Sequence, residues 1–347
     1  MKFHTNLVKP AAHILRTDTD LPNLQSSTDK SGVRPVSRTA ECAAAPPTGN
    51  LKFMRALFLE TCAHPEYKAK KRFGQHFLKD TGVLDRIVRW IEPSAGQVFI
   101  EIGAGTGALS VRLAEKAEAF TAIELDGDCI PVLEEALDHF DSAAVVHADI
   151  LSLDLAELAS KYHPGKNLRV VGNLPYNIGT AIIEKLLHCG LSQESGYNIE
   201  AMFFMLQLEV AERILAQPET REYGFLSVLC QHHAKTRMGF KVSPACFAPR
   251  PKVMSAVISL HPKPSGKNAE WEADFEELVK AGFAYRRKTL ANSLSRSVRF
   301  GGISPELLKK AGIDGARRAE SLSVAEYEHL TDTLKATSEN AKINACD

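Results

Sequence analysis

Short apolar runs alternate with longer amphipathic stretches through the middle of the chain, and this alternation predicts strands joined by helices. Strands are expected at residues 98–102, 120–123, 144–147, 168–171 and 201–206. Helices are expected at residues 81–90, 109–117, 128–140, 181–188, 209–216 and 225–233. Strands that alternate with helices are typical of a doubly wound, parallel α/β sheet, so we expect this fold class.

The pattern changes in the C-terminal part of the chain. Two further strands, at 237–242 and 253–260, flank a proline-rich loop, and we interpret them as an antiparallel hairpin at the end of the sheet. Residues 261–267 are typical of a linker, and several short helices are expected between 271 and 336. The sequence therefore predicts a first domain at 67–262, a small all-helical domain at 263–337 and a tail at 338–347.

Residues 1–66 are rich in proline, serine, threonine and alanine without a sustained period, which predicts a disordered extension. A targeting peptide is an alternative, although Asp18, Asp20 and Asp29 fit an organellar presequence poorly. A third alternative is that the segment precedes the real start of the reading frame, with Met54 as a plausible start.

The numbers of charged residues and cysteines exclude some classes of protein. Lys plus Arg and Asp plus Glu both number 42 in 347 residues, so the net charge is zero. The seven cysteines form no C-x-x-C pair, which argues against a zinc ribbon or a disulfide framework and favours a reducing, cytoplasmic compartment. Because no apolar run approaches the length of a membrane span, we expect no membrane association.

Basic residues gather in the C-terminal half in spite of the neutral total. Residues 223–269 and 280–305 contain no Asp or Glu, and a third basic cluster lies at the start of the predicted first domain. Cationic surface of this kind is typical of a protein that binds a phosphate backbone, although solvated basic faces are also common. The candidate RNA-binding residues are Lys70, Lys71, Arg72, Arg250, Lys252, Arg286, Arg287 and Lys288.

Glycines follow the first predicted strand of the sheet, and acidic residues follow the next two. The turn Gly103-Ala-Gly105-Thr-Gly107 would let a ligand approach the backbone, and Glu124 could accept hydrogen bonds from both ribose hydroxyls. Asp149 could accept from an adenine amine, or it could cap a helix at 151–155. These residues predict a nucleoside-like cofactor, and they leave open a dinucleotide or S-adenosylmethionine.

The strand at 168–171 runs into Asn173-Leu174-Pro175-Tyr176, which combines two acceptors with an aromatic ring. Pro175 prevents a regular helix here and favours an extended Leu174, whose carbonyl is then free to face a ligand. The amide oxygen of Asn173 is a neutral acceptor, and Tyr176 offers a face on which a base can stack. This stretch suits a planar ligand with an amino group, such as adenine, and its alternative is an ordinary proline-containing turn.

Three histidines, His76, His232 and His233, are candidate ligands by residue type. His76 more often satisfies a backbone group in such a place than touches a ligand. His232 and His233 have no partner at metal-binding spacing, so we interpret them as surface or packing residues and expect no metal.

Seven motifs occur in an order that resembles the ribosomal RNA adenine dimethyltransferases, in particular the KsgA type that acts on the small subunit. They are Gln-His-Phe-Leu (75–78), Glu-Ile-Gly-Ala-Gly-Thr-Gly (101–107), Ile-Glu-Leu-Asp (123–126), Asp149, Gly-Asn-Leu-Pro-Tyr-Asn (172–177), Phe-Ala-Pro-Arg-Pro-Lys-Val (247–253) and Phe-Ala-Tyr-Arg-Arg-Lys-Thr-Leu (283–290). The C-terminal stretch Arg317-Arg-Ala-Glu-Ser-Leu322 also resembles the small-subunit branch. Two positions depart from the family, which often has Asn in place of His76 and Pro in place of Ala104.

The resemblance implies a Rossmann-like, S-adenosylmethionine-dependent methyltransferase domain followed by a small helical RNA-binding domain. It implies that S-adenosylmethionine is held by Gly103, Gly105, Glu124, Asp149 and Asn173, with His76 and Leu78 closing over it. It also implies a substrate site in which Asn173 and the Leu174 carbonyl, shaped by Pro175, hold the target amine while Tyr176 and Phe247 stack on the base.

The implied activity is dimethylation of the exocyclic amines of adjacent adenines in the 3′-terminal hairpin of small-subunit (16S) rRNA. The implied partner is the immature small ribosomal subunit, and a cytoplasmic monomer is expected. An adenine amine is a poor nucleophile because its lone pair is delocalised into the ring. Neutral acceptors off the ring plane would aim that lone pair at the methyl donor, and no strong base is required.

Three alternatives share part of this pattern. A methyltransferase that modifies large-subunit (23S) rRNA and gives antibiotic resistance would carry nearly all the motifs. A ribosome-assembly factor without catalysis would need only the fold and the basic surface, although Asn173 and Tyr176 argue against it. A dehydrogenase is disfavoured because the sequence offers no acid/base pair for hydride transfer.

Overall fold

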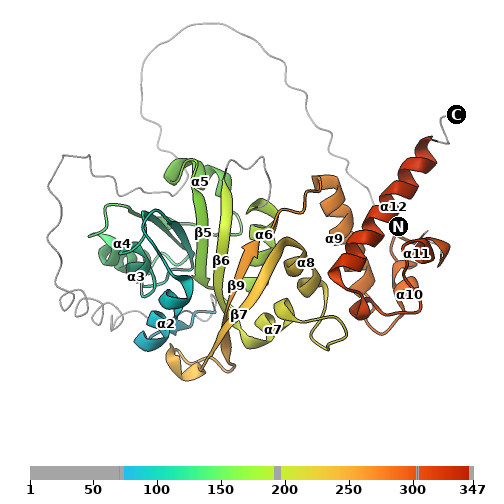
Figure 1. Cartoon of the computed structure of the whole chain (residues 1–347). Coiled ribbons are helices and arrows are strands. Elements are labelled where there is room, and N and C mark those ends of the chain that lie inside the picture. The colour runs from blue at the N-terminus through green and yellow to red at the C-terminus, as the bar shows by residue number, and fades with distance from the viewer. Residues whose placement is uncertain (1–69, 71–73, 191–196, 302, 304, 344–347) are drawn as a thin grey trace, which may run out of the picture. The chain divides into compact units, whose positions relative to one another are not determined.

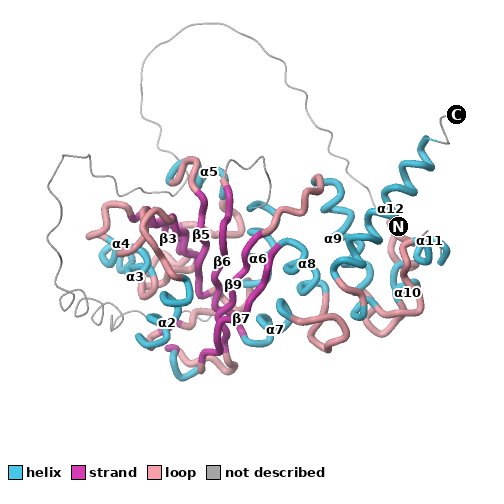
Figure 2. The backbone as a smooth tube through the Cα atoms, in the orientation of Figure 1, coloured by secondary structure: helices cyan, strands magenta, loops and turns pink. Residues whose placement is uncertain are grey.

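A seven-stranded sheet forms the centre of the residues that the structure, a computed structural model, describes, which are 70, 74–190, 197–301, 303 and 305–343. Its parallel strands are β2 (Val98–Ile102), β3 (Ala119–Glu124), β4 (Ala143–His147), β5 (Asn167–Asn173) and β6 (Asn198–Gln207). The antiparallel strands β7 (Ala234–Val242) and β9 (Ser255–Pro262) complete the spatial order β4-β3-β2-β5-β6-β9-β7. Figure 2 draws these strands in magenta.

Helices cover both faces of the sheet because the strands are apolar on both sides. Val98, Ile100 and Ile102 of β2 belong to one core, and Phe99 between them belongs to the other. One face is covered by α2 (Thr81–Ile91), α3 (Ser110–Ala114) and α4 (Ile130–Leu137). The other face is covered by α5 (Leu155–Tyr162), α6 (Gly179–Gly190), α7 (Leu208–Leu215) and α8 (Phe225–His233).

Every strand predicted from the sequence is present, and the predicted hairpin of β7 and β9 pairs antiparallel as expected. The doubly wound α/β fold class is therefore confirmed. Helix α5 was not predicted, and it begins at Leu155, where the helix considered at 151–155 would have ended. Asp154 starts this helix, because its side chain accepts hydrogen bonds from the backbone N–H groups of Ala156 and Glu157.

Two short strands tie the first described residues to the loop between β7 and β9. Strand β1 (Phe77–Leu78) pairs antiparallel with β8 (Phe247–Ala248), which follows the 3₁₀ turn η2 (Pro244–Cys246). This pairing places residues 74–77 beside the end of the sheet where β2 and β5 stop, since these residues line the cavity described below.

A third hydrophobic core lies among the C-terminal helices, which Figure 1 draws in orange and red. These are α9 (Ala269–Phe283), α10 (Leu290–Leu294), α11 (Pro305–Lys310) and α12 (Val324–Ile343), with the 3₁₀ turn η3 (Ala319–Ser321) before α12. Tyr223 and Val228, which come before and within α8, share this core with Trp271 and Phe275 of α9. The predicted boundary at 262/263 stays a prediction, since this core includes residues from both sides of it.

Several predictions fall on residues outside those that the structure describes. They are the extension at 1–66, the basic residues Lys71 and Arg72, and the last residues of the predicted tail. Helix α12 continues to Ile343, past the predicted end of the helical domain at 337. Within the described residues, none of the helices has the length and apolar character needed to cross a membrane.

Candidate active site

The candidate site lies where the order of the sheet changes direction. On one side of β2 lie β3 and then β4, and on its other side lie β5 and then β6. Ligands bind beyond the carboxyl ends of the strands at such a point, because the connections on the two sides diverge there. A cavity of about 230 Å³ opens at this place, and its lining includes His76, Gly103, Gly105, Glu124, Asp149, Asn173, Leu174, Pro175 and Tyr176.

The glycine turn after β2 forms one wall of the cavity. Gly103 and Gly105 have φ of +70° and +57°, in the left-handed region that favours glycine. A Cβ atom on Gly105 would lie 2.8 Å from the ring of Phe77, so a side chain there would displace the segment that crosses the site. The turn therefore brings bare backbone to the cavity.

Glu124 ends β3 with a buried carboxylate, of which 6 % is exposed. One oxygen accepts from the backbone N–H of Gly105 at 2.7 Å, and the other accepts from that of Asp126 at 2.8 Å. Burial raises the pKa of Glu124, and the same backbone hydrogen bonds act in the opposite direction. Each oxygen keeps a second lone pair, so the fixed carboxylate can still accept from a ligand that enters the cavity.

Asp149 follows β4 and lines the same cavity. Its carboxylate accepts from the backbone N–H of Leu151 at 2.9 Å, within a turn and not at a helix start. The alternative of a helix cap is therefore wrong, because the next helix, α5, begins at Leu155 and is capped by Asp154.

Asn173 is the last residue of β5, and its side chain is half-buried at the cavity wall. Its amide nitrogen donates to the backbone oxygen of His76 at 2.9 Å. Because this bond fixes the nitrogen, the amide oxygen is the end of the side chain that remains to accept a hydrogen bond. The backbone oxygen of Asn173 lies 3.7 Å from the position a Cβ would take on Gly103, so the β2 and β5 ends meet here.

Tyr176 holds its ring at the cavity by its hydroxyl, which forms a 2.6 Å hydrogen bond with the hydroxyl of Ser255 on β9. Burial raises the pKa of Tyr176, and the bond to Ser255 acts against this. The ring lies 5.3 Å from that of His76, with the planes tilted by 32°. The Nδ1 atom of His76 lies 2.7 Å from the backbone oxygen of Pro249, so His76 links the first described segment to the proline-rich loop.

Comparison with known proteins agrees with this geometry. A sequence model of the family described as "Ribosomal RNA adenine dimethylase" matches residues 66–336. The chain belongs to this family. It is 42 % identical over 270 residues to "Ribosomal RNA small subunit methyltransferase A" of Saccharophagus degradans, covering 77 % of this chain and 95 % of that protein. It is 39 % identical over 272 residues to the protein of the same name from Alkaliphilus oremlandii, covering 78 % and 93 %.

Solved structures show the same fold as this chain. A dimethyladenosine transferase from Plasmodium falciparum aligns with a TM-score of 0.61 at 23 % identity, covering 74 % of this chain and 96 % of that one. The 23S rRNA methyltransferase ErmE aligns with a TM-score of 0.55 at 26 % identity, covering 75 % and 99 %. The predicted family, the enzyme class and S-adenosylmethionine as the cofactor are thus confirmed, and the carboxylate of Glu124 beside bare backbone in a cavity suits such a nucleoside.

Two predicted residues of the dimethylase site are not at this cavity. Phe247 is 5 % exposed, packs in a hydrophobic core and does not line this cavity, so its stacking on a base stays a prediction. The ring next to Tyr176 is that of His76 instead. Leu78 lines a smaller adjoining cavity of about 60 Å³ together with Gly103 and Gly105. The β1–β8 pairing explains both positions, because it opposes Leu78 to Phe247.

Glu101 is a polar residue of the site that the sequence analysis missed. It lies in the middle of β2, is 3 % exposed and lines the smaller cavity, and the hydroxyl of Ser110 donates to it at 2.5 Å. Burial raises its pKa to about 8, with the Ser110 bond acting against burial and the charge of Glu124 adding to it. The available signal was an acidic residue within an otherwise apolar strand.

The basic residues predicted to bind RNA divide into two groups. Lys70 and Arg286 are engaged in contacts within the chain, and four others are exposed. Lys70 forms ion pairs with Asp126 and Asp128 at 2.6 and 2.5 Å. Arg286 donates to the backbone oxygens of Arg221 and Tyr223 at 2.8 and 3.0 Å. The residues on the surface are Arg250, Lys252, Arg287 and Lys288.

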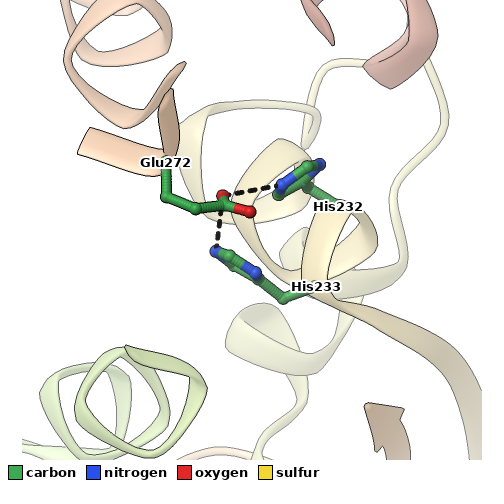
Figure 3. Close-up of side chains that lie close together, drawn as sticks. All are labelled: His232, His233 and Glu272. Carbon is green, nitrogen blue, oxygen red and sulfur yellow. Dashed lines mark hydrogen bonds and ion pairs between the residues drawn. The ribbon is translucent and has the colours of Figure 1, made fainter. Parts of the chain in front are cut away.

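Of the two interpretations of His232 and His233, packing is confirmed and a surface position is wrong. Both are buried at the end of α8, and Glu272 of α9 faces them, as Figure 3 shows. The nearness of Glu272 could not be predicted from the sequence, because Glu272 is 40 positions from His232 and only the packing of α9 on α8 brings it near.

Proposed function

We propose that this chain transfers two methyl groups to the exocyclic amine of each of two adjacent adenines in the 3′-terminal hairpin of small-subunit (16S) rRNA. The observation that carries the proposal is the position of Asn173, which lines the cavity together with the glycine turn and Glu124 and whose amide nitrogen is bonded to the backbone oxygen of His76. The curated relatives at 42 % and 39 % identity carry the name of small-subunit methyltransferases, which supports this substrate.

The cofactor part of the site is assigned to residues at the ends of β2, β3 and β4. Glu124 accepts from the ribose hydroxyls, and Asp149 accepts from the adenine amine of the cofactor. Gly103 and Gly105 allow close approach along the backbone, and His76 and Leu78 cover the bound cofactor. S-adenosylmethionine supplies a methyl group on a positively charged sulfur atom.

The substrate part of the site uses neutral acceptors. The Asn173 amide oxygen and the Leu174 carbonyl accept hydrogen bonds from the target amine, and Pro175 keeps this backbone extended. Two acceptors off the ring plane draw the nitrogen toward tetrahedral geometry and orient its lone pair. The base leaves its stack to reach this point, and Tyr176 offsets the cost by stacking on it. Phe247 joins as the second ring only after it leaves its core position.

The partner is inferred as rRNA within an immature small ribosomal subunit, bound by a cytoplasmic monomer. Arg250, Lys252, Arg287 and Lys288 are exposed and belong to two stretches without acidic residues, so they can meet phosphates. The helices after residue 263 act as the second RNA-binding part in this proposal.

The proposal is tested by incubating immature small subunits with the protein and S-adenosylmethionine, followed by mass analysis of the adenines. We expect dimethyladenine with the wild type and a loss of at least about 100-fold in rate with Asn173→Ala, since a positioned acceptor in the site is removed. Asn198→Ala is the matched control, because Asn198 is exposed at the other end of the neighbouring strand β6.

Purified large subunits are included in the same experiment. Methyl transfer to large subunits and not to small ones would assign the chain to the other substrate, which the curated relatives do not favour. Full activity of Asn173→Ala would remove Asn173 from the proposed site.

A further inference from the structure

A cluster of two histidines and a glutamate lies away from the candidate active site. His232 and His233 are the last residues of α8, and Glu272 lies in the first turn of α9. The histidines are 3 % and 6 % exposed. One ligand atom of each of the three residues lies within 4.8 Å of the others, and Figure 3 shows the carboxylate between the two imidazoles.

The distances within the cluster are close to those of a metal site. The Oε2 atom of Glu272 lies 3.0 Å from Nε2 of His232 and 4.0 Å from Nε2 of His233. In a tetrahedral zinc site, with bonds of about 2.0 to 2.2 Å, neighbouring donor atoms lie about 3.3 to 3.5 Å apart. All three donor atoms, including the two imidazole nitrogens, lie within 4.8 Å of one another. Shifts of at most about 0.7 Å per atom would therefore bring them to the spacing of donors around one ion.

Glu328 of α12 orients His232 from the opposite side, with its carboxylate 2.7 Å from Nδ1. In a neutral imidazole that donates from Nδ1, the Nε2 atom carries a lone pair, and here it faces a second carboxylate. That contact requires a positive charge between Nε2 and Glu272. A proton would serve only His232, because 4.0 Å is too long for a hydrogen bond to His233, whereas a metal ion would use all three donors.

Neighbouring side chains hold the donors in place. The hydroxyl of Ser265 donates a hydrogen bond to the carboxylate of Glu272. The His232 ring is fixed between neighbours, with the Phe275 ring centre at 4.1 Å and the stacked Trp271 ring at 5.6 Å.

We propose that His232, His233 and Glu272 form a binding site for one divalent transition-metal ion, with zinc as the best match to two imidazoles and a carboxylate. Glu328 acts as the carboxylate that orients a metal-bound histidine, a common arrangement around such ligands. The ion would join α8, which packs on the sheet, to α9 directly. It would join α8 to α12 through Glu328. Its effect is on the packing of the C-terminal helices and does not involve methyl transfer.

The first test measures metal content and zinc affinity of the full chain without a histidine tag. After dialysis against a chelator, addition of zinc and removal of the excess, we expect one zinc ion per chain. Zinc should also raise the thermal unfolding temperature, because an ion that binds only the folded state stabilises it by mass action. Cobalt in place of zinc should give the visible absorption of a tetrahedral ion.

Variants separate this site from chance binding. His233→Gln and Glu272→Gln each remove a ligand while keeping a side chain of similar size, and both should abolish stoichiometric zinc binding. Glu328→Ala should lower the zinc affinity about 10- to 100-fold, as expected for an orienting carboxylate. His188→Gln is the matched control and should bind zinc as the wild type does, since its ring lies 6.2 Å from that of His233 and it pairs with Glu276.

Two results would overturn the proposal. One is a wild-type chain that retains no zinc and shows no shift in its unfolding temperature. The other is an equal response of the wild type and both ligand variants, which means an adventitious ion only. Since the wild-type measurement needs no substitution, a variant that fails to fold does not leave the question open.

Discussion

The side-chain amide of Asn173 is held in one orientation at the candidate site. Its nitrogen is committed to the backbone oxygen of His76, so its oxygen can only accept. A carboxylate at the same place would add a full negative charge to the cavity that the buried Glu124 also lines. A neutral acceptor avoids that repulsion, which gives a physical reason for an asparagine here.

Tyr176 allows a separate test of base stacking. Tyr176→Ala removes the ring, and we expect kcat/KM for methyl transfer to fall about 10- to 100-fold, because stacking of one base is worth about 1–3 kcal/mol. Tyr176→Phe keeps the ring and loses only the bond to Ser255, so its loss should stay below about 10-fold. The measurement is a steady-state assay with small subunits. Equal losses in the two variants would mean that the hydroxyl, and not the ring, matters.

At the scale of elements, the ends of β2 and β5 bring the site together, and their spacing depends on a glycine. Gly172 lies against β2, where an added Cβ would be 2.5 Å from the backbone oxygen of Ile102. Any larger residue would push the two strands apart just before Gly103 and Asn173. Close packing of β2 and β5 therefore explains the glycine at position 172, directly before Asn173 of the proposed substrate site.

The start of α12 is another local element, formed by Ser323 and Glu326. The Ser323 N–H donates to Glu326 at 2.7 Å, and the Glu326 N–H donates to the Ser323 hydroxyl at 3.2 Å, which is a capping box. Arg317 pairs with the same carboxylate, and this hydrogen bond is the main cause that lowers the pKa of Glu326 to about 2. The stretch 317–322, which resembles the small-subunit branch, is thereby attached to α12.

Glu326→Ala should lower the free energy of unfolding by about 1–2 kcal/mol, because it removes the cap and an ion pair that is partly exposed to solvent. Glu326→Gln keeps an acceptor oxygen and should lose about half as much. Urea-induced unfolding measures both. Glu135→Ala, on the exposed side of α4, is the control and should change the value by less than about 0.5 kcal/mol. If Glu326→Ala also lowered the free energy of unfolding by less than about 0.5 kcal/mol, the capping role of Glu326 would be contradicted.

On the scale of the whole molecule, three hydrophobic cores support the site and contain few titratable groups. His163 is one of them, 3 % exposed, with its Nε2 atom 2.8 Å from the hydroxyl of Thr121. Its other ring nitrogen has no hydrogen-bond partner among the described residues. Burial lowers the pKa of His163 to about 4, so the folded protein binds its proton less readily than the unfolded chain does.

Stability should therefore fall as the pH falls from about 6.5, the ordinary histidine pKa, toward the folded value of about 4. The contribution is complete above pH 6.5 and is lost through this window by up to about 1.4 kcal/mol per pH unit. His163→Gln cannot titrate, so its free energy of unfolding should drop less than that of the wild type between pH 7 and pH 5. His139→Gln, an exposed histidine, should keep the wild-type slope.

Much of the fold could be predicted from the sequence, because strands buried on both faces are apolar and the helices between them are amphipathic. The positions of Gly103, Glu124, Asp149 and Asn173 followed from the same pattern, since each ends a parallel strand or comes directly after one. Strand ends of a parallel sheet share one edge, so local sequence was enough to place these residues near one another.

Tertiary structure alone decided the contacts between segments that are distant in the chain. The pairing of β1 with β8 keeps Phe247 in a core, and Ser255 of β9 holds the Tyr176 hydroxyl. Packing of α9 and α12 on α8 places Glu272 and Glu328 around His232. Local sequence carries the period of each element, whereas these contacts depend on how elements pack, and no periodicity records that.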